Sequence, residues 1–206
     1  MTLFITFLIT AVVLAVTPGP GIAYVVARTV SGGRTEGLAS CLGTAVGGMC
    51  HVAAAALGLS LLIAQSALAF SVVKYLGAAY LIYLGIRMLM QKPQPPAAVQ
   101  VAAQGPRRAF AEGIVVEALN VKTALFFLAF LPQFVAPGQP LVMQLVVLGS
   151  ICVLLNTLVD VVAVYAAARL LRSPAAQAAR ARLLTRVSGV TMLGLGAYLA
   201  LARRQA

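Results

Sequence analysis

The sequence is short of charged residues, and this shortage excludes most soluble folds. Only 9% of its 206 residues are charged, whereas 62% are hydrophobic. A soluble domain covers its core with a polar shell, which this composition cannot supply. We therefore expect an integral membrane protein with no room for a separate soluble domain.

Residues that support several kinds of chemistry are also scarce. The chain has one histidine, so a metal centre would have to rely on scattered cysteines. It has no Walker motif, so we do not expect ATP to drive any process. Cys41, Cys50 and Cys152 lie in apolar segments without a CxxC pair, which favours packing over a disulfide framework. We predict no enzyme activity, no metal and no cofactor.

Long apolar segments fill the chain instead. A helix needs about 20 apolar residues to cross the hydrocarbon core of a membrane. Six segments are candidates, at roughly 2–27, 38–64, 67–90, 110–134, 141–168 and 184–202. The first has no preceding basic residue and no clear A-x-A site, so we expect a retained span rather than a signal peptide. The fold class predicted is an all-α membrane protein, 1–206 being one domain.

The net charge of +11 would suit nucleic acid, but its distribution argues against that partner. Basic residues near the ends of membrane spans mark the cytoplasmic side. The links after the first, third and fifth spans hold eleven of the fifteen: Arg28, Arg34, Arg87, Lys92, Arg107, Arg108, Arg169, Arg172, Arg180, Arg182 and Arg186. We predict that these links are cytoplasmic and both termini external, although Arg203 and Arg204 oppose this.

A proline-rich connector, 92–108, divides the chain into two halves, 1–91 and 109–206, of three spans each. At an offset of 112 residues, Lys74 aligns with Arg186 and Gly77 with Gly189. The first span of each half also carries an irregularity near its middle. Because an odd number of spans inverts the second half, this pattern predicts two inverted three-helix repeats, as in many transporters.

The irregularity in the first span is the stretch TPGPG. Breaking a helix frees N–H and C=O groups that lipid cannot satisfy, so such a break survives only against protein or a water-filled cavity. The freed groups and helix ends can bind an ionic substrate. We predict substrate binding at five residues: Thr17, Pro18, Gly19, Pro20 and Gly21. The alternative is a proline kink packed by neighbouring side chains.

Polar residues inside the predicted spans are the other candidates, because a central charge costs about 2.5–3.5 kcal/mol on insertion scales. Glu117, Asn120 and Lys122 lie in the fourth span. In the fifth span Asp160 follows Asn156 by four residues, so both share a helix face. We predict that Asn120 and Lys122 bind substrate, while Asp160, with Glu117, carries a proton. A structural ion pair between Lys122 and a carboxylate is the alternative.

The second span contains GTAVGGMCH, in which small residues recur at helical spacing before His51. Such spacing lets helices approach closely. His51 is either part of the polar pathway or a packed, hydrogen-bonded imidazole. We interpret Glu36 and Glu112 as ordinary charges near the membrane boundary.

These stretches together resemble the LysE/RhtB family of amino-acid exporters. The resemblance runs in order through TPGPG, GTAVGGMCH, KYLGAAYLIYLGIRML, NVKTALFFLAFLPQFV, Asp160 and the final glycine-rich span. It implies six membrane helices and export driven by the proton-motive force across bacterial inner membranes. The family usually has Asn-Pro-Lys where this chain has Asn120-Val121-Lys122, and often an asparagine near Glu117. These departures predict a milder break and a changed preference for substrate charge or ion coupling.

We therefore expect an exporter of small amino acids such as threonine, homoserine or branched neutral ones, coupled to protons. An exporter of another solute or a divalent metal ion, a membrane thiol oxidoreductase and a non-transporting subunit remain alternatives. Four glycines could serve either a homodimer or packing within one bundle: Gly77, Gly85, Gly189 and Gly196.

Overall fold

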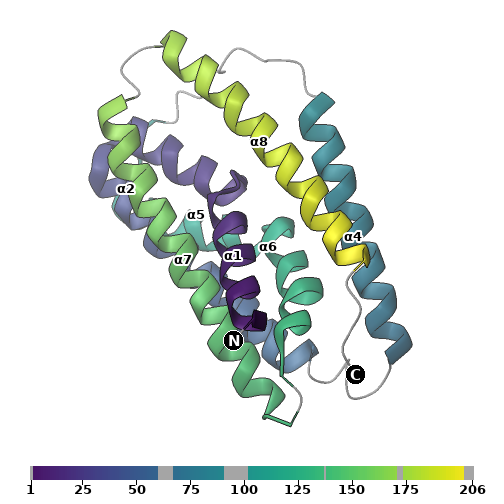
Figure 1. The fold of residues 1–206 in the computed structure, drawn as a ribbon. Helices are drawn as coiled ribbons and strands as arrows, with labels where there is room; N and C mark the ends of the chain where they lie inside the picture. The colour runs from purple at the N-terminus through teal and green to yellow at the C-terminus, as the bar shows by residue number, and fades with distance from the viewer. Residues whose placement is uncertain (1, 60–66, 91–101, 137, 171–173, 202–206) are drawn as a thin grey trace.

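The computed structural model describes residues 2–59, 67–90, 102–136, 138–170 and 174–201, and helices are its only regular elements there (Figure 1). The order is α1 (Thr2–Val16), α2 (Pro20–Ala54), the π-helix η1 (Ala55–Leu59), α4 (Ala67–Met90), α5 (Pro106–Ala118), α6 (Val121–Leu125), the π-helix η2 (Phe126–Phe130), the 3-10 helix η3 (Leu131–Phe134), α7 (Leu141–Leu170) and α8 (Pro174–Leu201). The all-helical fold is confirmed for these residues.

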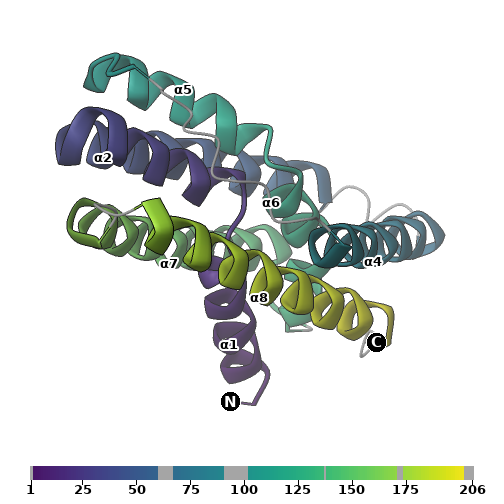
Figure 2. The same ribbon diagram turned by 90° about the horizontal axis from the view of Figure 1, so that it is seen from above.

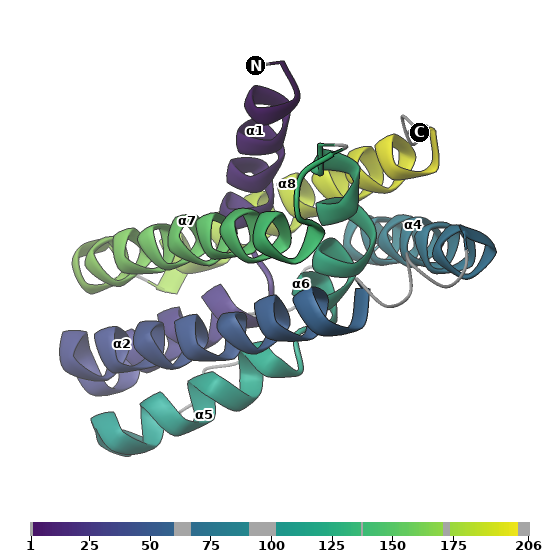
Figure 3. The ribbon, with the colours of Figure 1, turned by 90° about the horizontal axis from the view of Figure 1, so that it is seen from below.

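The helices form two groups joined by the short helices in the middle of the chain. Helices α5, α2 and α7 lie in a row, and α4 lies beside α8 on the other side (Figures 2 and 3). The run from α6 to η3 lies between the two groups, while α1 crosses at a steep angle and packs on α7. This arrangement brings the ends of α1 and α5 to the middle of the molecule.

Helix α2 contains a sharp reversal at the place where the sequence predicts the link between the first two spans, 28–37. Gly33 has φ 75° and ψ −171°, outside the helical region, and the positive φ favours glycine. The two arms of α2 lie side by side in Figure 3, and a Cβ on Gly37 would meet the side chain of Thr29. The chain therefore turns inside the predicted link, but the residues on both sides of Gly33 are helical.

The other predicted boundaries agree with the structure to differing degrees. The bounds predicted for the third span, 67–90, are those of helix α4, and those of the fifth match helix α7, which has two further residues. The last helix begins at Pro174, ten residues before the predicted start at 184. The end of the second span and most of the connector, 60–66 and 91–101, lie outside the described residues.

By length and composition alone, two described helices could cross a membrane: Leu141–Ala167, and Pro20–Gly58, which contains the reversal at Gly33. A third is the pair Pro106–Ala118 and Val121–Phe134, bent by 43°, if the two count as one broken span. Leu3–Val16 and Gly189–Leu201 are apolar but shorter. Six spans in two inverted repeats therefore stay a prediction.

Aromatic side chains of the core pack against one another around η2. Phe126 stacks on Phe130 at 5.4 Å between ring centroids, and Phe130 stacks on Tyr198 of α8 at 6.0 Å. Phe7 of α1 packs edge-on against Phe134 at 5.5 Å. Many large apolar side chains face outward instead, including those of α7 at Met143, Leu154, Leu158 and Val162. An apolar exterior of this kind suits lipid rather than water.

The glycines of α4 and α8 serve packing within the chain. A Cβ on Gly85 would lie 2.8 Å from the carbonyl oxygen of Gly189, and one on Gly196 would lie 2.9 Å from that of Ala78. These backbones therefore touch, which requires glycine at the contact. The same residues give no support to a homodimer, which stays a prediction.

Candidate functional site

The TPGPG stretch interrupts the first predicted span as expected. Helix α1 ends at Val16 and α2 begins at Pro20, with Gly19 extended at φ −141° and ψ −171°. Proline disfavours helical geometry in the residue before it, so Pro18 and Pro20 together open the chain at Thr17 and Gly19. Pro20 then starts α2 at a position where no N–H is needed.

A second break lies between α5 and α6. Helix α5 ends at Ala118, and Asn120 starts α6 with its side-chain oxygen accepting from the N–H of Lys122 at 3.1 Å. Asn120 therefore caps α6, whose first residue is Val121. The predicted break is confirmed, and the axes of the two parts differ by 43°.

Lys122 connects the second break to the first. Its Nζ donates to the carbonyl oxygen of Thr17 at 2.8 Å and lies 3.4 Å from that of Leu14. Both carbonyls lie at the end of α1, where the helix dipole is negative, and that of Leu14 also accepts from the N–H of Thr17 at 3.2 Å. A Cβ on Gly19 would lie 3.1 Å from the same Nζ, so glycine leaves room for the ammonium group.

Glu117 is buried, 2% exposed, beside the beginnings of two helices. Its Oε2 accepts from Asn120 Nδ2 at 2.9 Å, and its Oε1 accepts from Thr123 Oγ1 at 2.6 Å. The same Oε2 would lie 2.6 Å from a Cβ on Gly21, in the first turn of α2. The carboxylate thus lies at the positive ends of α2 and α6, which stabilise negative charge.

His51 binds the backbone at the second break, where the carbonyl oxygen of Glu117 also accepts from the N–H of Asn120 at 2.9 Å. Its Nε2 lies 2.8 Å from the carbonyl oxygen of Glu117. Because a carbonyl oxygen can only accept, Nε2 carries the proton of this hydrogen bond. The structure therefore places His51 as a hydrogen-bonded imidazole, one of the two interpretations left open by the sequence.

Asp160 is 1% exposed and lies against the hydroxyl of Thr44. Thr44 Oγ1 is 3.1 Å from Asp160 Oδ2 and 2.9 Å from the carbonyl oxygen of Cys41. The hydroxyl has one proton and two acceptor positions. It can therefore donate to an ionised Asp160, or accept from a protonated Asp160 while donating to Cys41.

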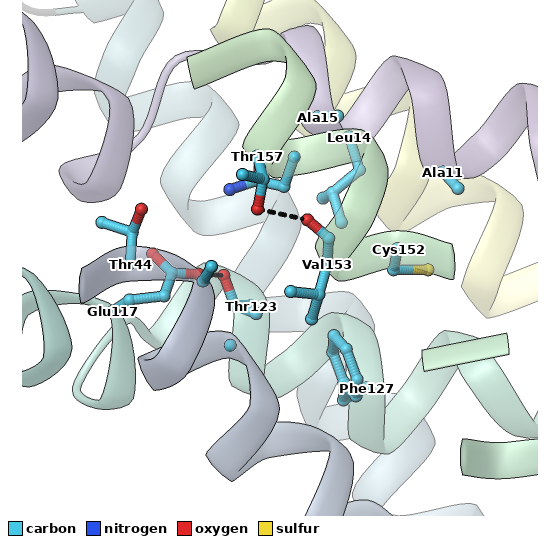
Figure 4. A pocket seen from close by; sticks show the side chains of 13 residues that line it. Ala11, Leu14, Ala15, Thr44, Glu117, Thr123, Phe127, Cys152, Val153 and Thr157 are labelled. Carbon is cyan, nitrogen blue, oxygen red and sulfur yellow. Dashed lines mark hydrogen bonds between the residues drawn. The ribbon is translucent and has the colours of Figure 1, made fainter. Parts of the chain in front are cut away.

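A narrow cavity lies between these groups (Figure 4). Thr44, Glu117 and Thr123 lie at one side of it, and Ala11, Phe127 and Cys152 lie at the other. Asn156 and Thr157 of α7 also line it. Its free volume of about 20 Å³ holds about one water molecule, so the cavity is closed to larger solutes.

The predicted site residues divide into two sets. Glu117 and Asn156 line the cavity, and Asp160 reaches it through Thr44. Lys122 and Asn120 lie behind Glu117 rather than on the cavity, as do the TPGPG residues: Thr17, Pro18, Gly19, Pro20 and Gly21. Thr44 and Thr123 were missed, although each lies near a predicted residue and carries a hydroxyl in an apolar segment. We call Glu117, Lys122 and Asp160 the cavity cluster.

A second buried group of charges was also missed. Arg28 Nη2 pairs with Glu112 Oε2, and Arg28 Nη1 lies 3.9 Å from Glu36 Oε2. Glu36 Oε1 accepts from the backbone N–H groups of Gln104 and Gly105 at 2.9 and 2.7 Å. Arg28 and Glu36 are each 3% exposed, so Glu36 is not the ordinary charge that the sequence suggested, whereas its place near a membrane boundary stays a prediction. We call Arg28, Glu36 and Glu112 the reversal cluster, since it joins both arms of α2 to α5.

The structure also bears on the alternatives. Among the described charged groups, no ion pair within 4.0 Å joins Lys122 to Glu117 or Asp160, so the predicted structural pair is not formed. All three cysteines are free, and Cys50 is exposed rather than packed. In the part of the chain that the structure describes, no three His, Cys, Asp or Glu side chains converge to hold a metal ion.

Apolar helices that are broken beside buried charges and a cavity have the features of a membrane translocator. Comparison with known families gives the particular class. The LysE type translocator family matches residues 12–203, and the chain belongs to that family. It is therefore a membrane-embedded transporter of small molecules rather than an enzyme, as the sequence predicted.

Known relatives agree with this assignment. A Vibrio cholerae uncharacterized membrane protein is 30% identical over 206 residues, covering 97% of each chain. A Salmonella typhimurium homoserine/homoserine lactone efflux protein is 31% identical over 153 residues, 74% of each chain. The Bacillus subtilis membrane protein YrhP is 34% identical over 157 residues, 72% of this chain and 75% of its own. No solved structure matches significantly.

Proposed function

We propose that this chain is a secondary exporter of amino acids or close derivatives, coupled to inward movement of protons by alternating access. Threonine, homoserine and other small neutral amino acids are the favoured substrates. The similarity to a homoserine/homoserine lactone efflux protein supports this class. The observation that carries the proposal is the placement of two buried carboxylates, Glu117 and Asp160, beside one cavity between two broken helices.

The cavity is the proposed substrate site. Glu117 and the hydroxyls of Thr44 and Thr123 offer acceptors to an ammonium group, and the apolar side accommodates a short side chain. The TPGPG residues, Asn120 and Lys122 act on the substrate indirectly, because they fix the broken helix ends around Glu117. A free volume of about 20 Å³ is too small for an amino acid, so binding requires a more open form.

Asp160 is the proposed proton carrier. Thr44 can match either protonation state by turning its hydroxyl, so neither state leaves Asp160 without a hydrogen bond. Thr44 also lines the cavity, which links a change at Asp160 to the substrate site. Glu117 is the second carboxylate that could share the proton, as the sequence predicted.

We place the protein in a bacterial inner membrane, with the basic segments after the first, third and fifth predicted spans in the cytoplasm. Two of these segments meet in the structure. Arg28 Nη2 donates to Gln104 Oε1 at 2.8 Å, just before Arg107 and Arg108 at the start of α5. Neighbouring basic segments at one end of the helices support a common side.

Transport from liposomes tests the proposal. Purified protein is reconstituted, the vesicles are loaded with labelled amino acids one at a time, and a pH gradient is imposed. We expect release of small neutral amino acids, lost in Asp160→Asn because the isosteric amide cannot carry a proton. Full gradient-driven release by folded D160N would overturn the proton role. Release of no amino acid or derivative by folded wild-type protein would overturn the substrate class.

A further inference from the structure

We infer that the cavity selects ammonium compounds whose carboxyl group is uncharged, such as amides, esters or lactones of small amino acids, over the free zwitterions. This inference rests on the proposed function and names the substrate class of the same site. Glu117 is the residue that sets the preference.

The cavity offers an acid but no base. Of the thirteen described residues that line it, Glu117 is charged and none is basic. The remaining polar groups are the hydroxyls of Thr44, Thr123 and Thr157, the amide of Asn156 and the thiol of Cys152. An ammonium group finds acceptors here, whereas a carboxylate finds a like charge.

The groups that could receive a substrate carboxylate are already taken by the chain itself. The amide of Asn120 and the hydroxyl of Thr123 donate to the carboxylate of Glu117, whose Oε2 also lies beside Gly21 in the first turn of α2. The ammonium of Lys122 is directed to the carbonyl oxygens of Leu14 and Thr17, away from the cavity. Glu117 therefore occupies the place where a zwitterion would put its own carboxylate.

The charge sum around the cavity leads to the same conclusion. Glu117, Asp160 and Lys122 interact electrostatically, and with both acids ionised their sum is one negative charge. A monovalent ammonium compound neutralises that sum. A zwitterion leaves it unchanged and brings its carboxylate close to Glu117, so it forfeits most of the attraction.

Paired substrates test this directly. Liposomes with the full-length protein are loaded with labelled threonine or threoninamide, and efflux is measured at pH 6.5, below the usual α-amino pKa of about 7.7–8.0. Protein-free vesicles correct for leakage. We expect threoninamide to leave at least about tenfold faster than threonine, the effect of one like-charge contact in a partly solvated site.

Variants of two glutamates in α5 test whether the charge of Glu117 causes the preference. Glu117→Gln removes the charge and is expected to reduce the threoninamide/threonine ratio at least about fivefold, whereas Glu117→Asp keeps the charge and the preference. Glu112→Gln makes the same chemical change on α5 outside the cavity and should leave the ratio unchanged. Fold is checked by size-exclusion chromatography and circular dichroism.

The outcomes separate the two proposals. Equal or faster efflux of threonine by wild type would overturn the inference while supporting an amino-acid exporter. An unchanged ratio in folded E117Q would also overturn it, because another feature would then set the preference. Efflux of neither compound, nor of any other amino acid tested, would overturn the proposed function and the inference with it.

Discussion

The cavity cluster and the reversal cluster both bury charges in an apolar chain, but they stabilise those charges in opposite ways. In the reversal cluster, Arg28 pairs directly with Glu112 and faces Glu36. In the cavity cluster, Glu117 and Lys122 instead bind neutral groups at broken helix ends. Charges that neutralise each other hold two elements together. A charge that is bound only by neutral polar groups beside a cavity can still attract or repel a charged solute.

This difference predicts that the reversal cluster matters most for stability and the cavity cluster most for transport. Breaking a buried ion pair leaves a charge without a partner, which costs about 3–5 kcal/mol. Removing a donor from neutral acceptors costs about 1–3 kcal/mol. Four substitutions, taken from the largest expected loss of stability to the smallest, would break or sharpen the contrast.

Arg28→Ala should cause the largest loss of stability, about 3 kcal/mol in the free energy of unfolding. It removes one of the two arginines that pair with Glu112 and the only described cation facing buried Glu36. Chemical unfolding in detergent, followed by circular dichroism, measures the loss. Arg34→Ala is the matched control, because Arg34 is exposed and lies 5.3 Å from the ring of Tyr165, a contact worth about 0.5–1 kcal/mol. Equal losses in both variants would show that the reversal cluster is not structural.

Lys122→Met should cost less stability but more transport. The methionine keeps the apolar stem and removes the donor to the carbonyl oxygens of Leu14 and Thr17, a loss of about 1–3 kcal/mol. Transport should fall at least about tenfold, since the end of α1 and the position of Glu117 are no longer fixed. Unfolding and liposome efflux on the same preparation give both numbers. A folded K122M with wild-type efflux would contradict the role assigned to this lysine.

Gly33→Ala tests whether the reversal of α2 requires a glycine at this position. Gly33 has φ 75° and ψ −171°, a conformation adopted almost only by glycine, and a Cβ there would meet nothing within 4 Å, so conformational strain is the expected cost, about 1–3 kcal/mol. Gly194 also has open space around a Cβ but lies inside α8. Gly194→Ala should therefore be neutral or stabilising by up to about 1 kcal/mol. Thermal unfolding of the two variants should move in opposite directions, and a parallel shift would rule out strain at Gly33.

The same glycine shows why the sequence placed the break at TPGPG to the residue but placed the other turn only within a link, 28–37. Pro18 and Pro20 act on neighbouring residues through local sterics, so the break at TPGPG is visible in the sequence. Gly33 lies in TVSGGRTEG, where either of two glycines could be helical or could turn. The choice depends on Glu36 reaching the N–H groups of Gln104 and Gly105, which are distant in sequence.

The site residues show the same contrast between local features, which the sequence reveals, and contacts between distant residues, which it does not. Glu117, Asn156 and Asp160 were found because a polar group in an apolar segment must have a partner, and that requirement holds whatever the partner is. The partner itself was not predictable, because it is set by packing between helices. Lys122 was expected to face a substrate and instead binds the end of α1. Thr44 was passed over because a threonine can satisfy its hydroxyl on its own helix.

Arg108→Ala should cause the smallest loss of stability of the four substitutions. Arg108 is an exposed residue that contacts the reversal cluster through Glu112. Arg108 Nε donates to Glu112 Oε1 at 2.8 Å, but its side chain is 64% exposed and the pair spans one helix turn. Such pairs contribute about 0.3–0.5 kcal/mol and weaken in salt. Unfolding at low and high salt should show a loss within this range at low salt only. A loss near that of Arg28→Ala would mean that Glu112 depends on both arginines equally, and that exposure does not separate structural from incidental charge in this cluster.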